Sequence, residues 1–170
     1  MKNFIKGFRF TPSNYPAAVE DKIQKYRKQG YKLPPRKVLR TPEQLEGIRE
    51  SAKINTALLD HIAENIREGI STEEIDVMVY DFTTKYGAIP APLNYEGFPK
   101  SVCTSINDVV CHGIPSKTEI LQSGDIINVD VSTIYKGYFS DASRMFMIGD
   151  VSPEMRKLVQ VTKECMEIGI

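Results

Sequence analysis

The spacing of apolar residues divides the chain into a helical part followed by a part rich in strands. Between residues 41 and 69 the apolar positions recur three or four residues apart, which predicts one long amphipathic helix. The apolar stripe of this helix consists of Leu45, Ile48, Ala52, Leu59, Ile62 and Ile66. A second helix is predicted between Ser71 and Gly87, with its stripe at Ile75, Val79, Phe82 and Tyr86.

Both helix starts carry the residues that close the first turn of a helix. Thr41 and Ser71 can each accept a hydrogen bond from a backbone N–H of that turn. Gln44 and Glu74 follow three residues later, at the spacing of a capping box. We therefore place the two helix starts at these positions.

After Gly87 the pattern changes to short runs typical of strands, separated by turn residues. Two hairpins are predicted, one joining strands 101–106 and 109–112 through Asn107-Asp108, the other joining strands 126–135 and 138–148 through Lys136-Gly137. A last helix begins at Ser152 and still continues at Ile170, where the sequence ends. This ending indicates a chain cut before its fold is complete.

The longer hairpin brings two carboxylates onto one face. A two-residue turn sets Tyr135 opposite Tyr138 and Ser132 opposite Asp141. Strand side chains alternate between faces, so Asp130 and Asp141 become diagonal neighbours on one face, roughly 7–8 Å apart. Such a pair can bind two divalent metal ions, act as an acid and a base, or lie on a solvated sheet face.

The shorter hairpin places Cys103 opposite His112. A thiol facing an imidazole leaves three interpretations open: a nucleophile pair, half of a metal site, or the wall of a pocket. The other histidine, His61, lies off the apolar stripe of its helix and is expected in solvent. Cys111 and Cys165 are expected to be small buried hydrophobic residues.

Charge separates the first 40 residues from the remainder. The chain has 170 residues, 41% hydrophobic and 26% charged, as in globular domains, and a formal net charge of zero. Residues 1–40 nevertheless carry +9 and residues 41–170 carry −9. Aromatic residues are interleaved with the cations, and Pro34-Pro35 favours extended chain. We interpret 1–40 as a basic extension that either straps the acidic body or contacts RNA.

Several locations and classes of protein are excluded or disfavoured. No apolar run approaches the roughly 20 residues of a membrane helix, and the basic N-terminus lacks an apolar signal segment. Three cysteines give no disulfide framework, so we expect a cytoplasmic protein with no membrane association.

Four stretches of the sequence closely resemble the signature of type I methionine aminopeptidase: Tyr95–Asn107, Val110–Pro115, Gly124–Val131 and Gly137–Phe146. The likeness extends from about Leu39 to Ile170. It implies the α+β pita-bread fold of creatinases and aminopeptidases, an antiparallel sheet with helices on one face. Residues 41–170 would form only its first half, ending within the first helix of the second half.

The resemblance also implies roles for six residues. It makes Asp130 and Asp141 ligands of two divalent metal ions (Co, Mn, Fe, Zn or Ni), and it makes His112 the histidine that contacts substrate and stabilises the transition state. Tyr95, Phe98 and Cys103 would form walls of the methionine pocket. The implied substrates are nascent peptides with N-terminal methionine and a small second residue.

The family completes its site with one histidine and two glutamates from the second half, which lie beyond residue 170. We therefore expect the 170 residues alone to be inactive and to self-associate through exposed apolar surface. Two other functions stay open: a non-catalytic pita-bread module that binds RNA or the ribosome through residues 1–40, and a hydrolase that uses Cys103.

Overall fold

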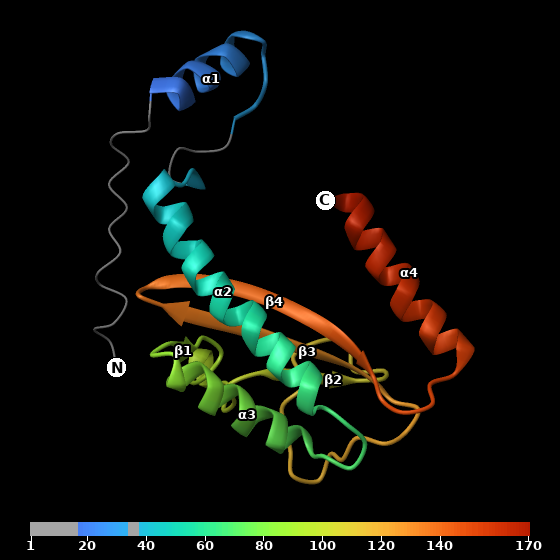
Figure 1. The fold of residues 1–170 in the computed structure, drawn as a ribbon. Helices are drawn as coiled ribbons and strands as arrows, with labels where there is room; N and C mark the ends of the chain where they lie inside the picture. The colour runs from blue at the N-terminus through green and yellow to red at the C-terminus, as the bar shows by residue number, and fades with distance from the viewer. Residues whose placement is uncertain (1–16, 34–37) are drawn as a thin grey trace. The chain divides into compact units, whose positions relative to one another are not determined.

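The computed structural model describes residues 17–33 and 38–170, which fall into two units divided between Glu46 and Gly47. The elements in chain order are α1 (Ala17–Lys28), α2 (Pro42–Asn65), α3 (Thr72–Lys85), β1 (Ile89–Pro90), a 3-10 turn (Tyr95–Gly97), β2 (Cys103–Ile106), β3 (Ile126–Tyr135), β4 (Tyr138–Met147) and α4 (Pro153–Gly169) (Figure 1). None of the helices among these described residues is long and apolar enough to cross a membrane.

The first unit contains a helix that the sequence analysis did not predict. Residues 17–28 include two Ala and three Lys with one Glu and one Gln, all of which favour helix. The helix α1 has no buried residue, and Gly30 follows it with a φ of +81°. The expected extended stretch at Pro34-Pro35 lies outside the described residues. The predicted capping box at Thr41 is confirmed, with Thr41 N donating to Gln44 Oε1 at 2.9 Å.

The second unit is built on the β3–β4 hairpin, whose predicted register is confirmed residue by residue. Tyr135 lies opposite Tyr138 and Ser132 opposite Asp141. β2 and β1 pair antiparallel with the other edge of β3, at residues 127–130 and 133–134 respectively. β3 is therefore the central strand of a four-stranded antiparallel sheet.

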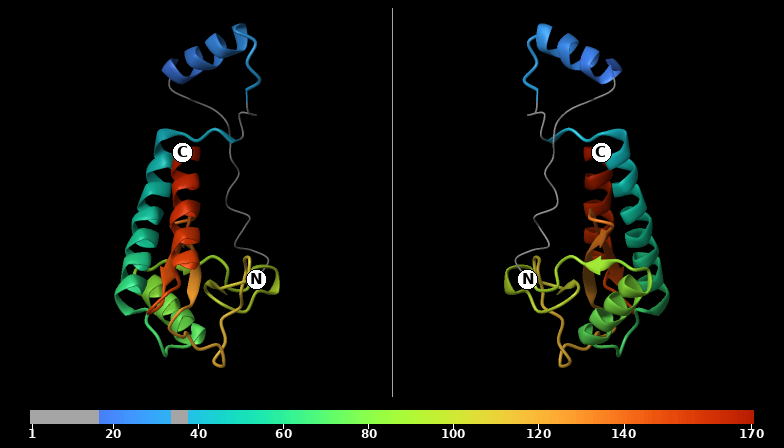
Figure 2. Two further views of the ribbon diagram at one scale, coloured as in Figure 1. Left: turned by 90° about the vertical axis from the view of Figure 1, so that its right-hand side faces the viewer. Right: turned by 90° about the vertical axis from the view of Figure 1, so that its left-hand side faces the viewer.

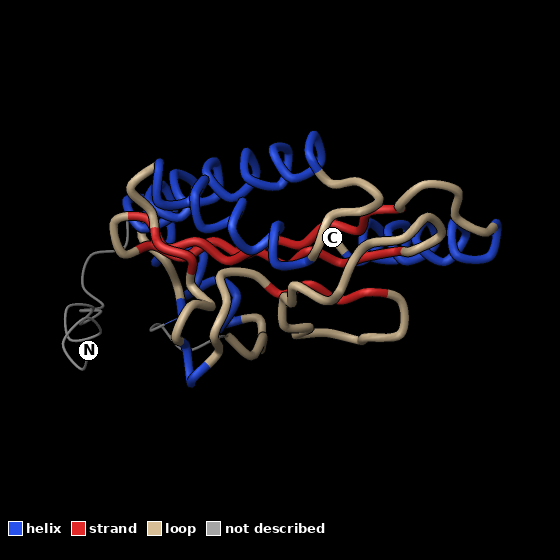
Figure 3. The backbone as a smooth tube through the Cα atoms, turned by 90° about the horizontal axis from the view of Figure 1, so that it is seen from below, coloured by secondary structure: helices blue, strands red, loops and turns tan. Residues whose placement is uncertain are grey.

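Helices α2 and α3 lie on one side of this sheet, and the loops between β1 and β3 lie largely on the other side (Figures 2 and 3). The core between helices and sheet consists of Leu58, Leu59, Ile62, Ile70, Ile75, Val79, Val102, Leu121, Ile127, Val129, Val131, Phe146 and Ile148. Since strand side chains alternate, burial of Val129 and Val131 turns Asn128, Asp130 and Ser132 to the loop side.

The seam between α2 and β3 is partly polar, which the apolar spacing did not predict. Ser51 and Asn55 are fully buried, whereas Leu45 from the predicted stripe is 41% exposed. Asn55 Nδ2 donates to Val131 O at 3.1 Å, and Asn55 Oδ1 accepts from Thr133 Oγ1 at 2.8 Å. In a sequence, a polar residue on the buried face of a helix cannot be told from one that faces solvent. The predicted buried face of α2 therefore omitted Ser51 and Asn55.

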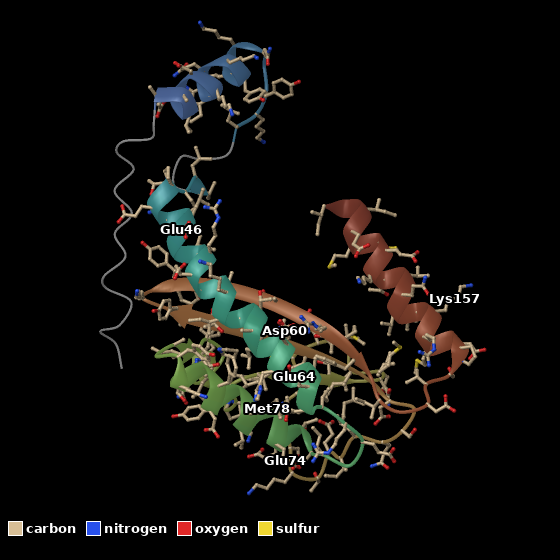
Figure 4. All side chains as sticks on the ribbon, in the orientation of Figure 1. Glu46, Asp60, Glu64, Glu74, Met78 and Lys157 are labelled. Atoms are coloured by element: carbon tan, nitrogen blue, oxygen red, sulfur yellow. The ribbon has the colours of Figure 1, made fainter. Side chains whose placement is uncertain are left out.

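The capping box of α3 is confirmed, with Ser71 N donating to Glu74 Oε2 at 2.8 Å (Glu74 is labelled in Figure 4). Tyr86, expected in the buried stripe, is 51% exposed because the helix ends there. His61, expected in solvent, is only partly exposed. Its ring stacks on Phe82, with 5.1 Å between ring centroids, and so bridges α2 and α3.

The shorter hairpin is the main error of the sequence analysis. β2 pairs with β3, and residues 109–112 form no strand. Thr104 N instead donates to Gly113 O at 2.9 Å, because His112 adopts a positive φ of 56° and bends the chain. Cys111 is therefore exposed rather than buried.

Helix α4 begins at Pro153 behind the N-cap Ser152, as expected, and has no buried residue. Several of its apolar residues are exposed, including Leu158 and Ile168. Cys165, expected to be buried, is exposed on this helix for the same reason.

We expect the substitution Asn55→Ala to destabilise the second unit by about 2 kcal/mol, because it leaves the buried Thr133 hydroxyl and the Val131 carbonyl without their partner. Thr56→Ala changes the exposed neighbour on the same helix and is expected to have little effect. Urea unfolding followed by circular dichroism measures both. Equal midpoints for the two variants would contradict a structural role for Asn55.

Candidate active site

The six residues singled out from the sequence line one cavity of about 850 Å³ on the loop side of the sheet. These residues are Tyr95, Phe98, Cys103, His112, Asp130 and Asp141. They come from the 3-10 turn, from β2, from the loop after β2, and from the two strands of the long hairpin. Residues distant in the chain thus meet at one hollow, while their individual roles stay predictions.

The carboxylates occupy the floor of the cavity. Asp130 lies opposite Ser143, and Asp141 lies opposite Ser132, whose Oγ donates to Asp141 Oδ1 at 2.5 Å. Burial raises the pKa of Asp130, and the nearby charge of Asp141 raises it further, while His112 lowers it. The two carboxylates therefore repel one another and favour a cation between them.

The donor chemistry of the floor fits part of a divalent metal site. Carboxylate oxygens bind divalent cations such as Mn²⁺ and also serve as ligands of Zn²⁺. Within residues 17–33 and 38–170, however, no three His, Cys, Asp or Glu side chains are grouped so that they could hold a metal ion. Asp130 and Asp141 can supply two ligands, and a complete coordination shell needs others.

Cys103 is buried beside Asp130, not paired across a hairpin with His112. β2 places Cys103 directly opposite Asp130 on β3. Burial, and then the charge of Asp130, raises the pKa of the Cys103 thiol to about 11. The thiol is protonated at neutral pH, which suits a pocket wall and disfavours a nucleophile.

His112 owes its place to a tight approach of two backbones. A Cβ on the following residue, Gly113, would come within 1.9 Å of the Thr104 carbonyl oxygen, so only glycine fits there. Gly113 N also donates to Ser105 Oγ at 3.3 Å. The loop is thereby fixed against β2, and His112 is exposed at the rim of the cavity.

Apolar side chains form one wall, and two of them escaped the sequence analysis. Tyr95 and Phe98 belong to a tight turn in which Asn94 N donates to Phe98 O at 2.8 Å. Phe139 and Ile114 also line the cavity. Strand alternation could have revealed Phe139, which shares a face of β4 with Asp141, whereas nothing in the local pattern marks Ile114.

Comparisons with known proteins identify the family of the chain. A family model described as "Metallopeptidase family M24" matches residues 46–170. The chain is 51% identical over 127 residues to methionine aminopeptidase A of Synechocystis, covering 75% of this chain and 50% of that protein. It is 46% identical to methionine aminopeptidase 1A of Arabidopsis thaliana, covering 78% of this chain and 33% of the relative. The chain thus spans half or less of the length of these relatives.

Solved structures give the same result for the fold. The methionine aminopeptidase of Rickettsia prowazekii superposes with a TM-score of 0.76 and 43% identity, over 78% of this chain and 53% of that one. A prolidase from Pyrococcus furiosus, at 19% identity and a TM-score of 0.62 over 89% of this chain and 44% of its own, shares the fold. The expected α+β pita-bread fold is confirmed as a partial fold, and the chain belongs to metallopeptidase family M24.

Proposed function

We propose that this chain supplies part of the active site of a cytoplasmic, dinuclear-metal methionine aminopeptidase. Its substrates are nascent peptides with N-terminal methionine and a small second residue. The proposal rests on one observation: Asp130 and Asp141 share the floor of a cavity with His112 at its rim and aromatic residues in its wall. Similarity to methionine aminopeptidases over three quarters of the chain supports it.

The cavity residues singled out from the sequence each have a task in this proposal. Divalent ions, when bound, supply Lewis acidity toward the scissile carbonyl and acidify water. Asp130 and Asp141 bind these ions, and the Ser132 hydroxyl holds the Asp141 carboxylate in one orientation. Ions of Co, Mn, Fe, Zn or Ni are compatible with such ligands.

The remaining residues act on the substrate. In this proposal His112 hydrogen-bonds the substrate near its scissile peptide and stabilises charge in the transition state. Tyr95, Phe98 and the protonated Cys103 enclose the methionine side chain, since a thioether packs well against aromatic rings and sulfur.

Metal binding by the 170 residues tests the role of the carboxylates. Asp130→Asn and Asp141→Asn are each expected to weaken Mn²⁺ binding at least about tenfold in calorimetry, because each removes one anionic ligand. Asp81→Asn, which alters an exposed carboxylate on α3, serves as the matched control. Equal affinities for all four proteins would contradict the metal site.

Hydrolysis of a Met-Gly-Met peptide tests the expectation that these 170 residues are inactive by themselves. With two carboxylates as the only assigned ligands, turnover should not exceed that of the Asp130→Asn variant. Robust hydrolysis by the unmodified chain, lost in Asp130→Asn, would overturn this expectation while supporting the metal site.

The thiol-hydrolase alternative is tested by alkylation. At pH 8 a thiol with a pKa of about 11 is thiolate in about one molecule in a thousand, so Cys103 should react slowly. We expect iodoacetamide to modify the exposed Cys111 and Cys165 at least about 100-fold faster, as read by peptide mass spectrometry. A Cys103 rate equal to theirs would favour the nucleophile interpretation.

We also propose that residues 1–40 contact ribosomal RNA. In the described part of this segment, α1 exposes Lys22, Lys25 and Lys28, and the rings of Tyr26 and Tyr31 pack edge to face at 5.6 Å. Cations beside exposed rings favour phosphate contact and base stacking.

A separate feature, the apolar residues exposed on α4, supports self-association of the 170-residue chain.

Deletion of residues 1–40 is expected to abolish binding to a single-stranded RNA in a fluorescence anisotropy assay. Binding by the full chain should weaken steeply as salt rises from 50 to 200 mM, because counterions are released from phosphate. An RNA affinity that is unchanged by the deletion, or that does not depend on salt concentration, would contradict this role of the extension.

A further inference from the structure

Three charged residues form a network next to the cavity without entering it. The Lys100 ammonium contacts the Glu73 carboxylate and lies 3.5 Å from Asp76 Oδ2. The Lys100 and Asp76 side chains are only 19% and 13% exposed. The described residues that line the cavity include none of the three. Removing charged side chains from water costs free energy, and a partly buried ion pair often adds little net stability. We therefore expect another role of this network.

Asp76 connects this network to the backbone of the cavity wall. Its second carboxylate oxygen, Oδ1, accepts a hydrogen bond from Ser101 N at 2.6 Å. Ser101 is itself 2% exposed and stands two residues before Cys103. Lys100 stands two residues after Phe98. Asp76 and Lys100 thus fix the short stretch of chain that joins two wall residues of the cavity.

The first turn of α3, marked by Glu74 in Figure 4, also binds the loop that follows His112. Thr72 Oγ1 accepts from Ser116 N at 2.8 Å, and Glu73 N donates to Ser116 O at 3.3 Å. Ser116 follows His112 by four residues. The same helix end therefore anchors both loops that carry cavity residues.

Lys100 keeps its positive charge at physiological pH. The hydrogen bond to Glu73 raises the pKa of Lys100, outweighing the opposite effect of burial. A raised pKa means that Lys100 stays protonated well above neutrality, so its attraction for both carboxylates persists. Lys100 Nζ also lies 3.5 Å from Asp76 Oδ2, while the other oxygen of Asp76 accepts from Ser101 N at 2.6 Å.

We propose that Asp76, held by Lys100 and Glu73, is a positioning residue that sets the cavity wall between Phe98 and Cys103. It touches no reacting atom and acts through the Ser101 backbone. The statement that this wall encloses methionine rests on the proposed function. The positioning role of Asp76 does not depend on that function, and it is tested without metal or turnover.

The test follows maleimide alkylation of Cys103 in the full 170-residue chain carrying Cys111→Ser and Cys165→Ser, at several low urea concentrations. We expect Asp76→Ala to speed alkylation about tenfold, because the wall then opens locally, and this gain should not depend on urea. Asp76→Asn should have a smaller effect, since its amide oxygen still accepts from Ser101. Asp81→Ala, on the exposed side of α3, is the control.

Lys100 provides an independent pair of variants. Lys100→Met is expected to speed alkylation severalfold, and Lys100→Arg to restore the original rate because it keeps the positive charge. The proposal is overturned if Asp76→Ala leaves the rate unchanged, or if the gain grows with urea in parallel with global unfolding. It is also overturned if Asp76→Asn matches Asp76→Ala, or if Lys100→Arg fails to rescue.

Discussion

The turn at Lys136-Gly137 constrains everything that the cavity contains. Both residues have positive φ, 49° and 83°, as a two-residue hairpin turn of type I′ requires. This turn fixes the register of β3 against β4 along ten residue pairs. A slip of one residue would move one carboxylate to the helix side of the sheet, because strand side chains alternate. The shared floor of Asp130 and Asp141 thus depends on the geometry of two residues outside the cavity.

The two faces of the sheet are specialised by what packs against them. On the helix side, apolar residues of α2 and α3 cover β3, and Asn55 and Ser51 bind the β3 backbone and Thr133. These polar contacts tie α2 to one position along the strand, since hydrogen bonds are directional. On the other side, polar side chains of β3 face a hollow lined by loops and by the 3-10 turn. The hydrophobic core and the cavity therefore lie on opposite faces of β3.

The loops around the hollow are irregular, yet they are held at defined points. Gly113 packs against the Thr104 carbonyl, and the first turns of α3 bind the backbone at Ser101 and Ser116. Each anchor is a backbone hydrogen bond or a close backbone approach, which side-chain substitutions in the cavity would leave intact. Such an arrangement allows the cavity residues to be exposed while their positions stay fixed.

Local signals in the sequence predicted both capping boxes, the long hairpin with its register, and the start of α4. They also predicted that Asp130 and Asp141 share a face, because turn geometry and strand alternation act over a few residues. The sequence did not predict the pairing of β2 with β3, the bend at His112, or the exposure of Cys111 and Cys165. It also did not predict the burial of Ser51 and Asn55, or the contact of Asp76 with the backbone of the cavity wall. These outcomes depend on partners distant in sequence, whose contacts no local pattern records.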